Sequence, residues 1–226
     1  MTLVGLSGLA ALLFSSCSST ETVRVMDKER AKQIAAFSAA KSDNGYDPAP
    51  ADPAVLAQAA DLPKDKHGMP TYPDDVTHRY VRATAYSHMQ NEPGAPGRMN
   101  AAGGILKYGN VRSVAADWSR YPLGTTFKIK GLPHLYVVDD YGSALTNTNT
   151  IDMFHPTLAG IKRWGVRNLE IDIVKMGSYE RSLALLKGRQ GYWHCKDMYD
   201  NAIAKVKAAG PAVASVQDES AEPQEG

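Results

Sequence analysis

Cysteine is nearly absent from this chain of 226 residues, which contains only Cys17 and Cys195. So few cysteines exclude the disulfide framework of a small secreted domain. The six histidines are scattered, and no two have the spacing of zinc ligands, so we expect no metal and no cofactor. Cys195 follows His194, a pairing compatible with a thiol nucleophile, but its neighbours Tyr192 and Trp193 favour a half-buried structural cysteine.

An excess of charge of either sign is also lacking. The chain has 25 Lys and Arg against 24 Asp and Glu, for a formal net charge of +1. Bulk electrostatics therefore gives no support to binding of nucleic acid or of an anionic membrane surface. We expect a monomer without a nucleic-acid partner.

No apolar run is long enough to cross a bilayer as a mature helix. The run at residues 3–14 is well short of the roughly 20 residues that a transmembrane helix needs, but fits the apolar core of a secretory signal. Small residues before Cys17 and a polar run after it look like a bacterial lipoprotein cleavage site. We expect residues 1–16 to be a signal peptide and Cys17 to carry lipid, which leaves Cys195 without a disulfide partner; an apolar helix that is not a leader is the alternative.

Between this leader and the first strand, large apolar residues are few. Residues 22–41, rich in Ala, Lys and Arg, predict a short helix with a narrow apolar stripe. Residues 43–75 hold six of the thirteen prolines, which predicts an extended and poorly ordered linker. Residues 17–77 would thus let a folded domain stand off the membrane that holds the lipid, which we expect to be the outer membrane, on its periplasmic side.

Short strands separated by Gly and Pro turns fill residues 78–177. The segments with strand character are 80–86, 111–116, 125–130, 135–138, 151–154 and 168–175. In the last of these, leucine and isoleucines alternate with Glu170 and Asp172, which predicts that both acids face solvent. A single short helix is expected at residues 156–164, with proline in its first turn. The pattern favours a small closed β-barrel over a sandwich or a doubly wound sheet.

The C-terminal part predicts helices and then a tail. Residues 178–208 should form a helix capped by Ser178 and a second helix over 197–207. Residues 209–226 contain four acidic residues and neither Lys nor Arg, which predicts a disordered acidic tail.

Two carboxylates lie beside apolar segments. Asp140 follows the apolar run 135–138 and precedes the turn at Gly142–Ser143, and Asp152 lies inside the apolar segment 151–154. A buried carboxylate without a partner costs several kcal/mol, so these positions need an explanation. One interpretation is turn formation and capping. The other is a carboxylate pair in an apolar cleft, with shifted pKa values.

Six segments, in order, resemble the 3D (three-aspartate) domain, which is shared with the C-terminal part of membrane-bound lytic transglycosylase A. These segments are residues 84–86, 100–103, 114–117 with 122–124, 137–145, 151–154 and 164–167. The resemblance implies a double-psi β-barrel with a groove for glycan strands. It also implies cleavage of the MurNAc–GlcNAc bond of peptidoglycan without water, leaving a 1,6-anhydro-muramyl end. The three aspartates of the motif would be Asp117, Asp140 and Asp152.

Glycosidic cleavage needs an acid for the leaving oxygen and a negative charge near the developing cation. We assign the acid, which then acts as base, to Asp152. Asp140 is the neighbour whose charge would raise the pKa of Asp152, and Asp117 is a third residue that orients the others or the substrate. The candidate substrate-binding residues are Thr84, Tyr86, Gly142 and Ser143.

Some alternatives remain open in the sequence. Asp117 is compatible with a turn cap alone, and Asp139 competes with Asp140 because consecutive strand residues face opposite sides. Tyr86 is compatible with a core position as well as with sugar stacking. Thr150 stands where the family often has Arg, which removes a cation that could hold polar sugar or peptide groups. A glycoside hydrolase that uses the same aspartates and a non-catalytic peptidoglycan-binding module are the alternatives to a cell-envelope lytic transglycosylase.

Overall fold

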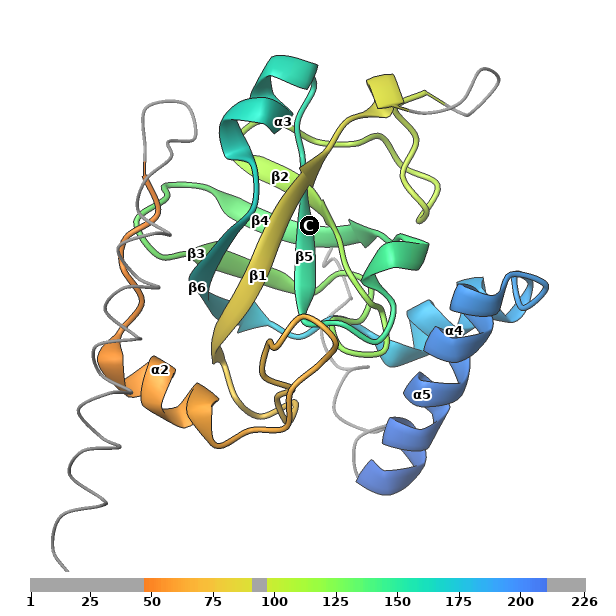
Figure 1. Ribbon diagram of the computed structural model, residues 1–226. Coiled ribbons are helices and arrows are strands. Elements are labelled where there is room, and N and C mark those ends of the chain that lie inside the picture. Colours follow the sequence, from red (N-terminus) through yellow and green to blue (C-terminus); the bar gives the residue numbers. More distant parts are fainter. Residues whose placement is uncertain (1–46, 91–96, 211–226) are drawn as a thin grey trace, which may run out of the picture.

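The computed structural model describes residues 47–90 and 97–210 (Figure 1). The expected signal peptide, the lipidated Cys17, the helix over 22–41 and nearly all of the acidic tail lie outside these residues. Six strands form a closed barrel: β1 (His78–Tyr86), β2 (Val111–Ala115), β3 (Thr126–Ile129), β4 (Leu135–Asp140), β5 (Thr150–Phe154) and β6 (Arg167–Lys175). Each of the six segments with strand character is therefore a strand of the barrel.

The strand order around the barrel is β1-β5-β2-β4-β3-β6. The pairs β1–β5 and β2–β4 are parallel, and the other four pairs are antiparallel. Exchanging β1, β2 and β3 with β4, β5 and β6 leaves every pairing and its direction unchanged. The barrel thus consists of two interlocked three-strand halves, which is the expected double-psi arrangement.

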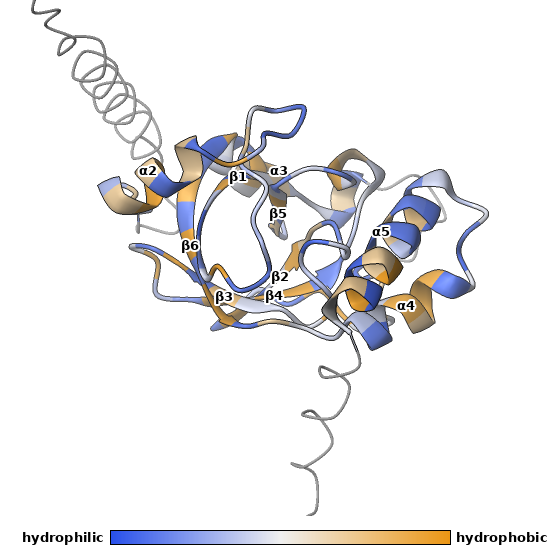
Figure 2. Ribbon diagram, turned by 90° about the horizontal axis from the view of Figure 1, so that it is seen from below, coloured by the Kyte–Doolittle hydropathy of each residue, from blue (hydrophilic) through white to orange (hydrophobic). Residues whose placement is uncertain are grey.

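Apolar side chains that alternate along the strands fill the barrel interior. The fully buried ones include Val81, Ala83, Val114, Phe127, Tyr136, Val138, Ile151, Met153, Leu169 and Ile171. In Figure 2 hydrophobic and hydrophilic colours follow each other along β6, as expected for a strand with one face in the core. Residues between these core positions, such as Thr84 and Asp152, therefore point to the outer face of the barrel.

The Pro-rich stretch from residue 47 to residue 75 is folded against the barrel, which corrects the extended linker expected from its composition. Helix α2 (Pro53–Ala60) has proline at its first turn, and the Asp52 side chain accepts a hydrogen bond from the Ala54 N–H. Apolar residues of this stretch form a second buried cluster with Tyr80 of β1: Ala51, Val55, Ala59, Met69 and Tyr72. The prolines here lie at a helix start and in turns. The stretch is folded because its apolar residues are buried against the barrel.

Glu170 of β6 is buried, although the alternation predicts it in solvent. It lies on the outer face, but the N-terminal stretch covers it: the Asp52 N–H donates to Glu170 Oε2 at 2.7 Å. The Lys130 ammonium lies 3.2 Å from the same oxygen and supplies the opposite charge. The side chain of Asp172, two residues along the strand, is half-exposed as expected. The period of the strand predicted the face of Glu170, but not the segment that covers it.

Four further short elements precede the last helix. They are the 3-10 turns η1 (His88–Gln90) and η2 (Ser143–Leu145) and the helices α3 (Leu158–Trp164) and α4 (Tyr179–Lys187). Ser178 caps α4 as predicted, since its side chain accepts from the Arg181 N–H. The last helix, α5 (Trp193–Ala209), begins at Trp193 rather than at Asp197, and packs with α4 beside the barrel (Figure 1). Within the described ranges, no helix has the length and apolar character needed to span a bilayer.

Candidate functional site

A row of paired residues crosses four neighbouring strands and contains both aspartates. Thr84 of β1 pairs with Asp152 of β5, Asp152 pairs with Ala115 of β2, and Ala115 pairs with Asp140 of β4. Paired residues point to the same face of a sheet, so all four side chains share the outer face. Asp140 and Asp152 are two strand spacings apart, about 10 Å between their backbones, with only the methyl group of Ala115 between them.

A β-bulge brings Asp140 into this row. The partner of Val114 is Val138, but the partner of the next residue, Ala115, is Asp140, so Asp139 is an extra residue in β4. Asp139 instead accepts from the Lys107 ammonium at 2.6 Å and from the Ser113 hydroxyl at 2.9 Å. Of the two consecutive acids, Asp140 is therefore the one aligned with Asp152, and Asp139 is neutralised by a lysine.

Asp152 is largely buried and has few hydrogen-bond donors. Its Oδ1 accepts from the Thr84 hydroxyl at 2.6 Å. Burial raises the pKa of Asp152 to about 6; the Thr84 hydrogen bond and the charge of Arg82 lower it, and the charge of Asp140 raises it. A carboxyl group with a pKa near 6 is partly protonated close to neutral pH, as a general acid requires.

Asp140 is held by three donors. Its Oδ2 accepts from the Tyr86 hydroxyl at 2.8 Å, and its Oδ1 accepts from the N–H groups of Ala101 and Tyr141, both at 3.0 Å. Burial raises the pKa of Asp140 above its usual value, these hydrogen bonds lower it, and the charge of Asp139 raises it. The donors stabilise the ionised form, so Asp140 is suited to carry the negative charge of the pair.

The predicted substrate-binding residues lie around the pair. The Tyr86 ring packs edge-on against Phe154 with centroids 5.7 Å apart, and burial together with Asp140 raises the pKa of its hydroxyl. Tyr86 is thus part of the support for Asp140. Gly142 has an ordinary extended backbone, with φ −150°, so no left-handed conformation requires glycine there. Ser143 is exposed at the start of η2, just after β4.

Arg82 is a component of the site that was missed in the sequence. It lies on the same outer face of β1 as Thr84, and its partner across the parallel pair is Thr150. Its charge lowers the pKa of Asp152, and within the described residues no hydrogen bond or ion pair occupies its guanidinium group. A half-buried guanidinium group without an acceptor is available to an anionic or carbonyl group of a ligand. Thr150 stands where the 3D family often has Arg, and its pairing with Arg82 places a cation on the neighbouring strand, opposite this position.

Asp117 is fully buried in a turn and makes no hydrogen bond to Asp140 or Asp152 among those of the described residues. Its Oδ1 accepts from the Ser119 N–H at 2.8 Å and from the Ser119 hydroxyl at 2.7 Å, and its Oδ2 accepts from the Asn147 N–H at 2.6 Å. Asn147 has a positive φ of 61°, a conformation that Asn tolerates better than most residues. Asp117 therefore fixes the loop between Asp140 and Asp152 and is not part of their row.

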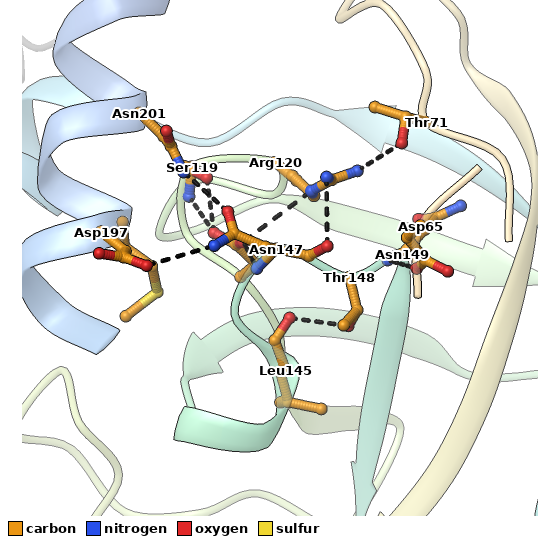
Figure 3. A network of polar contacts seen from close by, with 12 residues as sticks. Asp65, Thr71, Ser119, Arg120, Leu145, Asn147, Thr148, Asn149, Asp197 and Asn201 are labelled. Carbon is orange, nitrogen blue, oxygen red and sulfur yellow. Dashed lines mark hydrogen bonds and ion pairs between the residues drawn. The ribbon is translucent and has the colours of Figure 1, made fainter. Parts of the chain in front are cut away.

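The same loop is attached to α5 and to the N-terminal stretch (Figure 3). The Asn147 side chain donates to Asp197 at 3.3 Å and accepts from Asn201 at 2.8 Å. Arg120 donates to the Thr71 hydroxyl at 2.9 Å and to the Asn147 carbonyl at 3.3 Å. An open pocket of about 300 Å³ lies at this junction, and neither Asp140 nor Asp152 is among the residues that line it. No group of three or more His, Cys, Asp or Glu in the described ranges is placed to hold a metal ion.

Comparisons with known proteins find a solved structure and a family model that are similar to part of this chain. The crystal structure of the apo expansin of Clavibacter michiganensis is 15% identical, with a TM-score of 0.32. The match covers 45% of this chain and 52% of the expansin, so the chain spans about half the length of that protein. No curated protein sequence matches the chain. The family model of the 3D domain matches residues 112–176, which include all of β3 to β6, β2 except its first residue, and all three candidate aspartates. Residues 112–176 of this chain are therefore similar to the 3D domain.

Proposed function

We propose that the barrel acts on cell-wall polysaccharide, and that Asp152 and Asp140 cleave the MurNAc–GlcNAc bond of peptidoglycan in a lytic transglycosylase reaction during peptidoglycan turnover. The 3D-domain match supports the cell-wall assignment through what that family resemblance implies. The observation that carries the catalytic part is the shared outer face of the two carboxyl groups, of which one has a pKa of about 6 and the other has three donors.

The reaction needs a proton, a negative charge and a nucleophile. Protonated Asp152 gives its proton to the glycosidic oxygen while the bond from C1 to that oxygen breaks. The ionised Asp140 stabilises the positive charge that develops at C1. The C6 hydroxyl of the MurNAc residue then bonds to C1 of that residue and gives its proton to Asp152. The acid is regenerated, no water is consumed, and a 1,6-anhydro ring remains.

Three neighbouring residues would assist this step. Thr84 fixes the orientation of the Asp152 carboxyl group through its 2.6 Å hydrogen bond. Tyr86 does the same for Asp140. The guanidinium group of Arg82 would donate hydrogen bonds to a carbonyl or carboxylate oxygen of the muramyl substituent, which would place the sugar relative to Asp152. Asp117 would act only through the loop that it holds.

Digestion of purified sacculi tests the proposal. The wild-type protein should release anhydro-muropeptides, detected by mass spectrometry, and Asp152→Asn should release at least a hundredfold less, because general acid catalysis contributes roughly 10²–10⁴-fold. Asp172→Asn is the matched control, since Asp172 is a half-exposed acid on β6 outside the row. Products with ordinary reducing ends would indicate a hydrolase. Retention on sacculi with no product, unchanged by Asp152→Asn, would indicate a wall-binding module.

The location in the cell is a second part of the proposal. The leader sequence supports a lipoprotein whose Cys17 carries the lipid and holds the barrel at the outer membrane, on its periplasmic side. Replacement of Cys17 by Ser should move the protein from the membrane fraction to the soluble fraction and remove the lipid mass from its N-terminal peptide. An unmodified Cys17 in the membrane fraction would contradict the lipid anchor.

A further inference from the structure

Two large aromatic side chains are exposed side by side at the start of α5. Tyr192 is 66% exposed and Trp193 is 61% exposed. The ring of His194 contacts both, with centroid distances of 5.9 Å to Tyr192 and 5.6 Å to Trp193. These residues follow the segment matched by the 3D family model, which ends at residue 176. The family match therefore does not account for them.

Stability of α5 does not explain these residues either. Tyr192 occupies the N-cap position, and its side chain makes no capping hydrogen bond. Ser, Thr, Asp or Asn at this position would satisfy an N–H group of the first turn, and tyrosine is unable to do so. Trp193 then begins the helix with most of its ring in solvent. A local choice that disagrees with helix stability is typical of a functional position.

The aromatic residues are connected to Asp140 indirectly, through His194 and Tyr141. The His194 ring lies 5.8 Å from the ring of Tyr141, the residue that follows Asp140. In the turn before α5, the Arg189 guanidinium donates to the Tyr141 hydroxyl at 3.1 Å and to the Ala101 carbonyl at 2.9 Å. The N–H groups of Ala101 and Tyr141 are the two backbone donors to Asp140. The start of α5 is thus fixed to the loops that form one side of the site.

We propose that Tyr192 and Trp193 form a platform on which a sugar ring of the glycan strand stacks as the strand extends from Asp140 along α5. The C–H face of a pyranose is apolar and flat, whereas its hydroxyl groups lie at the edge, so it fits a broad aromatic ring with polar neighbours. Polar residues are near in the chain: Lys196 follows Trp193 by three residues in the same helix and forms an ion pair with Asp200. The proposal rests on the function proposed above, because the occupant of the platform is the glycan that reaches the carboxyl pair.

Trp193 also provides a direct signal. Of the three tryptophans in the chain, Trp118 and Trp164 are 0% and 1% exposed, so a collisional quencher in water reaches Trp193 selectively. The Asp152→Asn variant allows binding to be measured without cleavage. We expect soluble uncrosslinked glycan strands, obtained from sacculi by amidase digestion, to reduce acrylamide quenching of Trp193 in this variant. Vesicles of phosphatidylethanolamine and phosphatidylglycerol should not change it.

Substitutions separate the platform from the catalytic residues. In the Asp152→Asn background, Trp193→Ala should weaken glycan binding about tenfold, as for an aromatic contact residue, and Trp193→Tyr should retain most of the affinity. Val206→Ala is the matched control, because Val206 is a partly exposed apolar residue of the same helix, about 20 Å along its axis.

Three results would overturn the platform. The first is glycan binding that leaves Trp193 fully accessible to acrylamide and is unaffected by Trp193→Ala. In that case the proposed cleavage would still stand if sacculi were digested to anhydro products. Protection by the vesicles and not by glycan would assign the rings to a lipid surface instead. Absence of both glycan binding and product release would overturn the proposed function together with the platform.

Discussion

Asp140 and Asp152 approach Ala115 from opposite sides, each as its strand partner on one of the two neighbouring strands. Because of this pairing, the two carboxylates have the same orientation although 12 residues (152 − 140) separate them in the chain. The smallest side chain with a Cβ stands between them, and this alanine is itself buried, with 4% of its surface exposed. A larger residue at position 115 would therefore crowd the two carboxyl groups.

The rate of cleavage should depend on pH in a bell shape. Asp152 has to be protonated, so kcat/KM falls as the pH rises through about 6, the pKa of this group. Asp140 has to be ionised, so the rate also falls on the acid side, at a pH above the usual pKa of an aspartate because burial raises the pKa of Asp140. Initial rates of anhydro-muropeptide release between pH 3.5 and pH 8.5, roughly the range in which carboxylates and His titrate, will show both limits. A rate that rises continuously to pH 8 would contradict the assignment of Asp152 as the acid.

The same group links activity to stability. The pKa of Asp152 is higher in the folded state than in the unfolded state. The contribution of its protonated form to the free energy of unfolding is therefore complete below about pH 4, and is lost as the pH rises through about 6. Asp152→Asn removes the cost of burying the charge and should raise the free energy of unfolding by about 1–3 kcal/mol at pH 7.5, with little gain at pH 4. Urea unfolding at the two pH values measures this difference. An equal effect at both pH values would show that charge burial is not its cause.

Tyr86→Phe removes a donor from Asp140 and keeps the ring. The loss should raise the pKa of Asp140, because the hydrogen bond from the Tyr86 hydroxyl lowers it. The acid limb of the pH–rate profile should therefore move to higher pH while the alkaline limb changes little. The packing of the ring against Phe154 is retained, so the loss of stability should stay within about 1–3 kcal/mol. Tyr179→Phe, which removes a hydroxyl that donates to Asp74, is the control and should leave the profile unchanged.

Arg82→Gln should move the alkaline limb. The positive charge of Arg82 lowers the pKa of Asp152, so its removal raises that pKa and extends activity to higher pH. KM should rise in the same variant if the guanidinium group binds the muramyl substituent. Arg82→Lys restores the charge without the forked geometry, so it should return the pH limit towards that of the wild type and leave part of the KM defect. If the alkaline limb of Arg82→Gln moved to lower pH instead, the charge of Arg82 would not be what lowers the pKa of Asp152.

Local sequence features predicted the barrel well, because each strand is short, alternating and limited by Gly or Pro. They did not predict the bulge at Asp139, which appears only when Ala115 is paired with β4. Strand alternation alone cannot choose between Asp139 and Asp140, and the family pattern was needed to favour the second. The burial of Glu170 and the folding of residues 47–75 were missed for one reason. Residues 47–75 pack against the barrel and bury Glu170, and local sequence does not predict this long-range contact.

Arg82 was missed for a similar reason. It is distant from Thr150 and Asp152 in the sequence, and only the parallel pairing of β1 with β5 brings them together. Composition and local motifs therefore located the acids, whereas the cation and the support around the acids depend on long-range pairing. The platform at Tyr192 and Trp193 is an intermediate case: both aromatics were visible in the sequence, but only their exposure makes them candidates for binding.

Asp117→Asn separates a structural aspartate from a catalytic one. The amide group would present a donor to either the Ser119 or the Asn147 N–H, so one buried donor loses its acceptor. We expect a loss of about 2–4 kcal/mol in the free energy of unfolding and a markedly lower melting temperature. Well below that temperature, kcat/KM should fall less than about tenfold, because the row from Thr84 to Asp140 does not include Asp117. A variant with wild-type stability and no cleavage would instead give Asp117 a direct role in the reaction, and Asp172→Asn controls for the removal of a charge alone.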